Sequence, residues 1–269
     1  MAEPMPGSLL SRVRRPDPDR EWERFGREDP YFGVYSDDRF RSDRLDEEAR
    51  ADFFASGEMH IDAAMDLIQS DLDPGFAPRR ALELGCGVGR LLVPLSQRCE
   101  EVVGVDISEP MVREARHNLA ERGIQNVTVL RVDASLSGVA GPFDWVHSFI
   151  VLQHVPARRG MRLVQRLVDL LGEGGIGVLH LTFDSDLSRR SRLVRWARQS
   201  LPLVHTLWNR RYGLPGDAPW MEMNRYDLNR VFRQLQDEGC HRTVARFTNH
   251  FGHRGIVLFF KKEPQPGFP

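Results

Sequence analysis

The chain has 269 residues, of which 41% are hydrophobic, so it can bury a sizeable core as one large domain with additions. Its 37 Lys and Arg residues nearly balance its 38 Asp and Glu residues, and the net charge of −1 argues against a globally basic surface for nucleic acid. No apolar run of about 18 residues, the length that spans a bilayer, occurs in the sequence. The three cysteines lack a C-x-x-C pair, which favours a reducing compartment. We therefore expect a cytoplasmic protein that does not bind nucleic acid.

The N-terminal part divides into two segments. Residues 1–20 are rich in proline and lack the apolar core of a signal peptide, so we expect a disordered tail. Residues 21–77 are expected to form a helical cap that carries an aromatic cluster. Packing of an extra helix and lining of a pocket explain this cluster equally well. Its members are Trp22, Phe25, Tyr31, Phe32 and Tyr35. Tyr31 and Phe32 are the candidate substrate contacts from this segment.

Residues 78–184 are expected to form the core of an α/β fold. Short apolar runs alternate there with helical patterns, which is typical of repeated βαβ units and a parallel sheet. The expected strands are 80–84, 102–106, 127–132, 143–149 and 176–182. The expected helices are 90–96, 109–121 and 162–171.

A glycine-rich turn follows the first expected strand, in the run A-L-E-L-G-C-G-V-G-R from Ala81 to Arg90. Because Gly85, Gly87 and Gly89 lack a Cβ atom, the backbone can turn tightly and let a ligand approach its free amides. Cys86 is expected to be a small residue that fits the turn, since nothing nearby indicates a thiol of lowered pKa.

Two acids end the next two expected strands. Asp106 follows the run V-V-G-V, where a carboxylate can accept both hydroxyls of a ribose. Asp133 follows V-L-R-V and could accept a hydrogen bond from an exocyclic amine, or it could cap the following turn. The three strand ends are thus predicted to converge on one nucleoside.

These motifs resemble the class I S-adenosylmethionine-dependent methyltransferases, and more closely their small-molecule branch. The similar stretches are E-L-G-C-G-V-G-R, V-V-G-V-D-I-S, V-D-A, and the run from Phe143 to Pro156. The resemblance implies a doubly wound, Rossmann-like sheet of seven strands, mostly parallel with an antiparallel last strand. N-terminal and inserted helices would form a lid over it.

The resemblance also implies a set of residues that bind S-adenosylmethionine. In the family the glycine turn holds the methionine moiety, the acid at the Asp106 position binds the ribose, and the acid at the Asp133 position contacts the adenine. Glu83 fits either a cofactor contact or a brace for the glycine loop. The full set of expected cofactor residues is Glu83, Gly85, Cys86, Gly87, Gly89, Asp106, Ile107, Met111, Asp133, Ala134, Phe149 and Gln153.

The C-terminal third contains an insert and the end of the core. Residues 185–224 are expected to form a basic helical lid, because seven arginines and no acid occur between Leu187 and Gly216. A solvated, core-packed lid is one interpretation; capture of an anionic substrate group or weak contact with anionic lipid is the other. Residues 225–262 should supply a helix at 225–238 and a hairpin of strands 242–248 and 255–261, and 263–269 a short tail.

Three histidines are candidates for chemistry. His154 follows the fourth expected strand, and an imidazole there could act as general base toward the acceptor, or it could only shape the loop before Pro156. His250 and His253 lie in the hairpin loop and are candidate substrate contacts. Two histidines without a third ligand do not predict a metal site, so we expect no metal.

The leading functional prediction is methyl transfer from S-adenosylmethionine to a small molecule, with S-adenosylmethionine as the cofactor. Two alternatives stay open: a non-catalytic protein that binds the same cofactor, and a nicotinamide-dependent dehydrogenase, since a glycine loop plus an acid also describes that site. The acid at Asp133 and the closing hairpin favour the methyl donor. Neither the acceptor nor the oligomeric state follows from the sequence.

Overall fold

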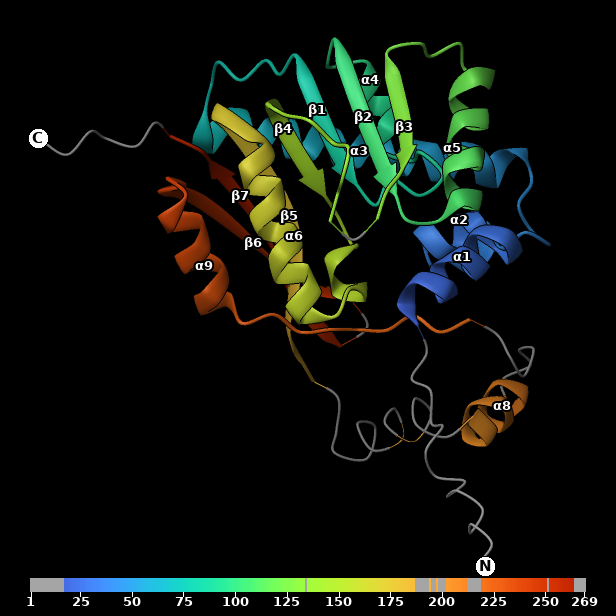
Figure 1. Ribbon diagram of the computed structural model, residues 1–269. Coiled ribbons are helices and arrows are strands. Elements are labelled where there is room, and N and C mark those ends of the chain that lie inside the picture. The colour runs from blue at the N-terminus through green and yellow to red at the C-terminus, as the bar shows by residue number, and fades with distance from the viewer. Residues whose placement is uncertain are drawn as a thin grey trace, which may run out of the picture.

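A single seven-stranded sheet organises the protein. The computed structural model describes residues 17–133, 135–186, 194, 197, 202–211, 219–250 and 252–263. The strand order is β3-β2-β1-β4-β5-β7-β6 (Figure 1), and β7 is antiparallel to both of its neighbours, which confirms the predicted fold class. The strands are β1 (Arg80–Leu84), β2 (Glu101–Asp106), β3 (Val127–Arg131), β4 (Phe143–Ser148), β5 (Leu171–Ser185), β6 (Arg242–His250) and β7 (His253–Lys261).

Helices cover both faces of this sheet. The helices in the described part of the chain are α1 (Pro18–Glu28), α2 (Pro30–Val34), α3 (Glu47–Leu67), α4 (Leu92–Ser96), α5 (Glu109–Glu121), α6 (Ala157–Leu170), α8 (Pro202–Arg211) and α9 (Leu228–Asp237). Short turns of helix lie at η2 (Asp38–Phe40), η3 (Ile68–Leu72) and η4 (Leu152–His154). Helices α6 and α9 pack on one face, and α3, α4 and α5 on the other (Figure 1).

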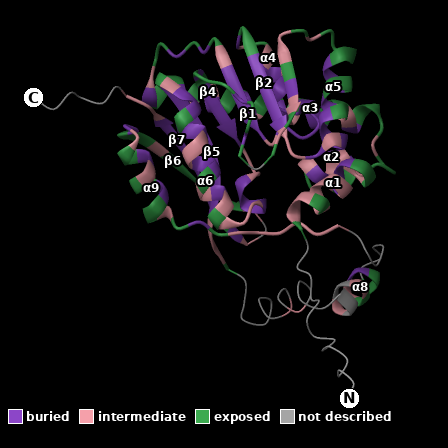
Figure 2. Ribbon diagram, viewed as in Figure 1, coloured by how far each residue is buried: buried purple, intermediate pink, exposed green. Residues whose placement is uncertain are grey.

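The central strands are buried on both faces, as Figure 2 shows. Leu82 and Leu84 of β1 point into the cluster shared with α6 and α9. Their neighbour Ala81 points into the opposite cluster, together with Trp145 of β4. This alternation follows from the two-residue period of a strand. Because both faces of the sheet are buried, the sequences of the central strands carry apolar residues at consecutive positions.

The strand order reverses at β1, because β1 pairs in parallel with β2 on one side and with β4 on the other. Leu82 is opposite Val103 of β2 and Val146 of β4. In doubly wound sheets ligands bind outside the carboxyl ends of the strands at such a reversal. The fold therefore places the candidate site above the ends of β1, β2 and β4.

The N-terminal cap packs on α5 through a buried tyrosine. The Tyr31 hydroxyl lies 2.8 Å from Glu114 Oε1 and 2.9 Å from Asn118 Oδ1, both on α5. Tyr31 also packs against Phe53 of α3 with 5.0 Å between ring centroids. Burial raises the pKa of Tyr31, so its hydroxyl stays protonated and available as a donor.

Helix α1 begins inside the segment predicted to be a disordered tail. Asp17 is its N-cap, with its carboxylate accepting from Asp19 N, and Pro18 occupies the first turn. Helix α6 also begins earlier than predicted, at Ala157, directly after Pro156. Residues 1–16 lie outside the described part of the chain.

Residues 219–226 cross the carboxyl edge of the sheet as an extended segment, which we call the strap (Figure 1). Its Trp220 N–H donates to Glu21 Oε2 of α1 over 2.8 Å. Its Tyr226 hydroxyl donates to Leu152 O over 2.7 Å and lies 3.0 Å from Val155 O. The strap thus joins the N-terminal cap to the turn that follows β4.

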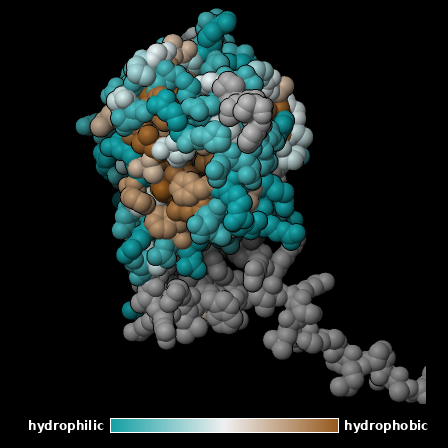
Figure 3. Space-filling model, turned by 90° about the vertical axis from the view of Figure 1, so that its left-hand side faces the viewer, coloured by the Kyte–Doolittle hydropathy of each residue, from teal (hydrophilic) through white to brown (hydrophobic). Residues whose placement is uncertain are grey.

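Strand β6 forms one edge of the sheet and carries an exposed aromatic side chain. Phe247 is 76% exposed and lies beside Phe183, with 6.2 Å between ring centroids. Figure 3, which looks at the side of the molecule that carries β6 and α9, shows an apolar patch within a hydrophilic surface. Among the described residues, no helix has the length and apolarity needed to cross a membrane.

Candidate functional site

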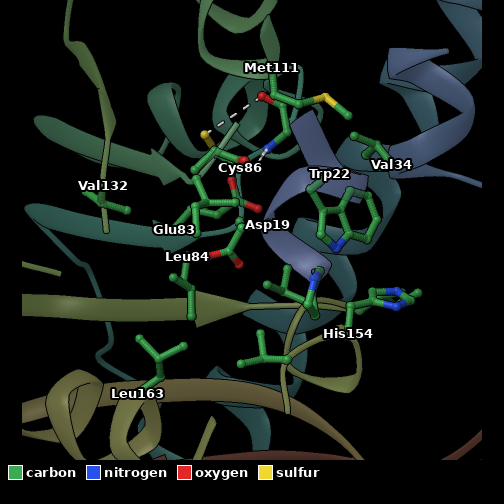
Figure 4. Close-up of a pocket in the computed structure, with 18 of the residues that line it drawn as sticks. Asp19, Trp22, Val34, Glu83, Leu84, Cys86, Met111, Val132, His154 and Leu163 are labelled. Carbon is green, nitrogen blue, oxygen red and sulfur yellow. Dashed lines mark hydrogen bonds between the residues drawn. The ribbon is translucent and has the colours of Figure 1, made fainter. Parts of the chain in front are cut away.

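A deep pocket lies above the strand ends where the order reverses (Figure 4). It encloses about 1010 Å³, including the part that is open to solvent. Its walls come from the glycine turn, the ends of β2 and β3, the residues after β4, the start of α6, and helices α1 and α2.

The glycine turn forms the floor of the pocket. Gly85 has φ +74° and Gly87 has φ +52°, so both adopt the left-handed conformation that glycine tolerates. A Cβ atom on Gly85 would lie 2.4 Å from Val151 Cγ2, and one on Gly87 would lie 2.3 Å from Val34 Cγ2. Side chains from α2 and from the loop after β4 therefore pack directly on the turn.

Asp106 fixes the turn from the end of β2. One carboxylate oxygen accepts from Gly87 N over 2.9 Å, and the other accepts from Ser108 N over 2.9 Å. Burial raises the pKa of Asp106, and these backbone hydrogen bonds oppose that shift. The carboxylate can accept further hydrogen bonds from a ligand, because each oxygen has more than one lone pair.

Glu83 is a buried acid on the α3 side of the pocket. It is 3% exposed, and its Oε2 atom has no hydrogen-bond partner among the described residues. Burial raises the pKa of Glu83 to about 8, although the nearby Arg90 lowers it. An unsatisfied buried carboxyl oxygen costs free energy, so a donor from a bound ligand would stabilise this side chain.

Asp133 is held by its own loop. Its carboxylate accepts from Ser135 N over 2.9 Å and Ser135 Oγ over 2.8 Å, and from Ser137 Oγ over 2.9 Å. The Ser135 side chain is the largest cause of a strongly lowered pKa for Asp133. The carboxylate is thus fixed and ionised at the β3 side of the pocket. Asp133 caps the turn that follows β3, and it also lines the pocket.

The outer part of the pocket is closed by α1. Asp19 of α1 accepts from Arg159 Nη1 of α6 over 2.7 Å, so the two helices meet across the mouth. Trp22, one turn further along α1, packs edge-on against His154 with 5.1 Å between ring centroids. Figure 4 shows Trp22 and His154 beside each other on one side of the pocket.

Comparison with known proteins identifies the domain that carries this pocket. Residues 81–175 match the family profile of a methyltransferase domain. The chain therefore contains a methyltransferase domain at these residues.

Two curated methyltransferases resemble the chain over this region. Aklanonic acid methyltransferase from Streptomyces sp. strain C5 is 32% identical over 138 residues, which cover 50% of this chain and 60% of that protein. A 23S rRNA (uracil(1939)-C(5))-methyltransferase from Alkalilimnicola ehrlichii is 35% identical over 112 residues, which cover 42% of this chain and 24% of that protein. The chain thus spans less than two thirds of the length of these relatives.

Solved methyltransferases share the fold. Magnesium protoporphyrin IX methyltransferase from Synechocystis PCC 6803 with bound S-adenosylhomocysteine has a TM-score of 0.57 at 20% identity, covering 91% of this chain and 100% of that chain. The N-methyltransferase NodS from Bradyrhizobium japonicum WM9 has a TM-score of 0.52 at 15% identity, covering 91% of this chain and 99% of that chain. At these identities the likeness shows the class I methyltransferase fold.

The structure gathers most of the predicted methyltransferase site in one pocket. The predicted residues that line it are Glu83, Gly85, Cys86, Gly87, Asp106, Ile107, Met111, Asp133, Phe149 and His154. Gly89 and Gln153 do not line this pocket, and Ala134 lies outside the described residues. Burial raises the pKa of Cys86 far above its usual range, so its thiol is inert, as a residue that only fits the turn should be.

The aromatic cluster of the cap splits between the two roles predicted for it. Trp22 lines the pocket, whereas Tyr31 is buried in the interface with α5. Phe32 packs in the same N-terminal cluster, with the Arg41 guanidinium 3.7 Å from its ring centroid. Tyr31 and Phe32 therefore hold the cap in place and do not line the pocket.

His250 and His253 also lie off this pocket. His250 belongs to a group of aromatic rings around Phe149, with 5.3 Å between its centroid and that of His180. His253 begins β7 and is buried. In the described part of the chain, no three His, Cys, Asp or Glu side chains are arranged to hold a metal ion.

Several residues that line the pocket were not predicted as site residues, among them Asp19, Val151 and Arg159. Val151 packs on Gly85, which needs tertiary contact that no local pattern reveals. For Asp19 a local signal existed, because Asp17 followed by Pro18 is a typical helix start that moves the cap toward the N-terminus.

Proposed function

We propose that this chain binds S-adenosylmethionine in the pocket and transfers its methyl group to a small-molecule acceptor. The observation that carries this proposal is the meeting of the glycine turn with Asp106 at the strand-order reversal, inside a methyltransferase domain. The bound S-adenosylhomocysteine in two structures of the same fold supports the choice of cofactor.

The residues present fit this cofactor. Gly85 and Gly87 both line the pocket, and their left-handed conformation lets the backbone turn tightly at the place where the ligand would lie. We infer that this turn holds the methionine moiety, Asp106 the ribose and Asp133 the adenine. The unpartnered Oε2 of Glu83 offers an acceptor for a ligand amine on the α3 side.

The cofactor supplies a methyl group that its sulfonium makes electrophilic. The chain's part is then to bind the acceptor, align its attacking atom and exclude water, and such alignment corresponds to effective molarities of up to ~10⁵–10⁸ M. Trp22 and the apolar residues Val151, Val155 and Leu163 give the pocket its aromatic and aliphatic walls. Such walls suit a small apolar or aromatic acceptor.

A small-molecule acceptor is favoured over RNA. The net charge is −1, and the match to the rRNA methyltransferase covers only 24% of that protein, which leaves most of that enzyme without a counterpart. The name of the aklanonic acid enzyme denotes a small acid as its substrate, and its match covers more of both chains. A cytoplasmic location stays a prediction from the cysteines.

The basic insert stays a separate prediction. Five of its seven arginines, Arg189, Arg190, Arg192, Arg195 and Arg198, lie outside the described residues. Arg210 and Arg211 end helix α8 and are exposed. Capture of an anionic group and weak contact with anionic lipid therefore rest on the sequence alone.

Binding and turnover can be tested separately. We expect calorimetry to show binding of S-adenosylmethionine and S-adenosylhomocysteine but not of NADH. Asp106→Asn should weaken binding by about 10- to 100-fold, because a hydrogen bond to a charged group contributes ~1.5–3 kcal/mol. Preferred binding of NADH would favour the dehydrogenase alternative.

Turnover requires an acceptor, which a metabolite extract and a labelled methyl donor can supply. Transfer of label to a small molecule, lost in Asp106→Asn, would support the enzyme. Cofactor binding without transfer to any fraction would favour the non-catalytic alternative, and label found in added RNA would contradict the small-molecule acceptor.

A further inference from the structure

A chain of hydrogen bonds runs behind the pocket from β5 to the strap. The Thr182 hydroxyl donates to Gln153 Oε1 over 3.1 Å, and Gln153 Nε2 lies 3.1 Å from His154 Nε2. On the other side of the ring, His154 Nδ1 lies 2.7 Å from Glu222 O. Thr182, Gln153 and His154 are 1%, 4% and 6% exposed, so water does not compete for these contacts.

The partners of His154 determine which of its nitrogens carries the proton. A backbone carbonyl can only accept, so Nδ1 must be the donor to Glu222 O. In a neutral imidazole Nε2 is then an acceptor, and it needs the N–H of an amide opposite it. The Gln153 amide N–H supplies this donor, and the Gln153 amide oxygen accepts from Thr182. The side chains in this series of hydrogen bonds are thus matched donor to acceptor.

This arrangement occupies the lone pair that a general base would use. His154 can accept a substrate proton at Nε2 only after Gln153 has moved away. The pKa of His154 is lowered to about 4, mainly by burial; the hydrogen bond to the Glu222 carbonyl opposes this shift, and the nearby His253 adds to it. The ring is therefore neutral at physiological pH.

The same arrangement orients the aromatic wall of the pocket. The His154 ring meets Trp22 edge-on at 61° and lines the pocket beside it. The backbone of Gln153 adds a second tie to the strap, since Gln153 O accepts from Asn224 N over 2.6 Å. Gln153 thus contacts β5, the strap and His154, while it does not line the pocket itself.

We propose that Gln153 is a positioning residue, whose amide locks the neutral His154 ring so that His154 and Trp22 form a fixed, non-ionising wall at the acceptor end of the pocket. The relevance of this role to methyl transfer rests on the proposed function. It replaces the direct cofactor contact that the family resemblance implied for Gln153, and it makes His154 a wall residue instead of the general base.

The test is a histidine titration by NMR, which does not require an acceptor. With ¹³C-labelled histidine and His154→Gln to identify the signal, His154 of the unchanged protein should not titrate between about pH 5 and about pH 8. Gln153→Glu places a carboxylate opposite Nε2 and should raise the pKa of His154 by about 1–3 pH units, into the observable range. Gln97→Glu adds the same charge at an exposed site and should leave His154 unchanged.

A second variant guards against misfolding of the first. Thr182→Val keeps the volume but removes the donor to Gln153 Oε1, so the amide can turn and present its oxygen to Nε2. It should therefore also raise the pKa of His154, by less than Gln153→Glu. Thermal unfolding of both variants checks that they fold.

Two results would overturn the proposal. One is a His154 signal that titrates near pH ~6.5 in the unchanged protein, which would leave Nε2 free to act as a base. The other is a cofactor dissociation constant that rises more than about tenfold in Thr182→Val or Gln153→Glu, as expected if Gln153 touched the cofactor. Because the histidine titration needs neither cofactor nor acceptor, failure of the proposed function would leave that test intact.

Discussion

The Asp19 carboxylate and the Arg159 guanidinium join the first turns of α1 and α6 across the mouth of the pocket, 2.7 Å apart. Their side chains are 41% and 21% exposed, so the pair is only partly screened by water. Both residues line the pocket, one from each helix, so their contact closes part of its rim.

Breaking this ion pair should speed release of the cofactor. Partly exposed pairs contribute ~0.2–1 kcal/mol, so Asp19→Asn should raise the dissociation rate of S-adenosylhomocysteine about two- to fivefold. Stopped-flow displacement would measure it. The matched control is Arg20→Gln, which removes the more exposed pair with Asp17 on the outer side of α1. Equal rates in Asp19→Asn and the unchanged protein would mean that α1 does not gate the mouth.

Gly87→Ala should abolish most cofactor binding for two separable reasons. Alanine at φ +52° is strained, and its Cβ would lie 2.3 Å from Val34 Cγ2. We expect the dissociation constant to rise by more than about tenfold, while adding Val34→Ala should recover the steric part only. Gly123→Ala is the matched control, because Gly123 has φ +66° with nothing within 4 Å of the added Cβ. If the double variant bound no better than Gly87→Ala, the contact with Val34 would not matter.

Substitutions of Trp22 and Tyr31 should have different effects on ligand affinity and on the free energy of unfolding. Tyr31→Phe loses the hydroxyl bonded to Glu114 and Asn118, so we expect a loss of about 1–2 kcal/mol in the free energy of unfolding with unchanged cofactor affinity. Trp22→Ala should weaken ligand binding more than it lowers stability, since Trp22 lines the pocket. Urea unfolding and calorimetry on both variants provide the comparison. If both variants lost similar amounts of stability, Trp22 would be a packing residue like Tyr31.

Four histidines with strongly lowered pKa values predict a stability that falls with acidification. Burial is the largest cause of a lowered pKa at all four, to about 3 for His60 and His180, to about 4 for His154, and well below its usual range for His147. Below pH ~6.5 the unfolded chain binds protons that the folded chain does not, so the free energy of unfolding decreases as pH falls toward ~4.

Glu83 acts in the opposite direction. Its folded-state pKa of about 8 means that the folded chain keeps a proton which the unfolded chain loses above pH ~4.5. Because the four histidines outnumber Glu83, the free energy of unfolding should still decrease as the pH falls from ~6.5 to ~5. Urea unfolding at two pH values would show it, with exposed His117→Gln as control. A slope near zero would mean that the histidines protonate in the folded state.

The sequence predicted the sheet closely, because strand periodicity and strand-end acids are local signals. The strand predicted at 127–132 is Val127–Arg131, and that at 143–149 is Phe143–Ser148. Asp106 and Asp133 reach the pocket because parallel strands present their carboxyl ends at one edge of the sheet.

Side-chain direction was the part that local patterns could not give. Gln153 lies in a short helical turn after β4, and its orientation depends on Thr182, a residue 29 positions away. Trp22 and Tyr31 differ in role because they lie on different helices, joined at Asp29, that present different faces to α5. Those contacts connect segments more than 80 residues apart, where sequence spacing carries no information.

The cap has one more consequence, for how this domain can be dissected. The profile match covers residues 81–175, yet Pro18, Asp19, Trp22, Gly33 and Val34 supply part of the pocket wall. A fragment trimmed to the matched residues would therefore lack the part of the pocket wall that the first two helices supply, and its pocket would be more open to solvent. Substrate selectivity grafted from this protein onto another methyltransferase core would have to bring the first two helices along with it.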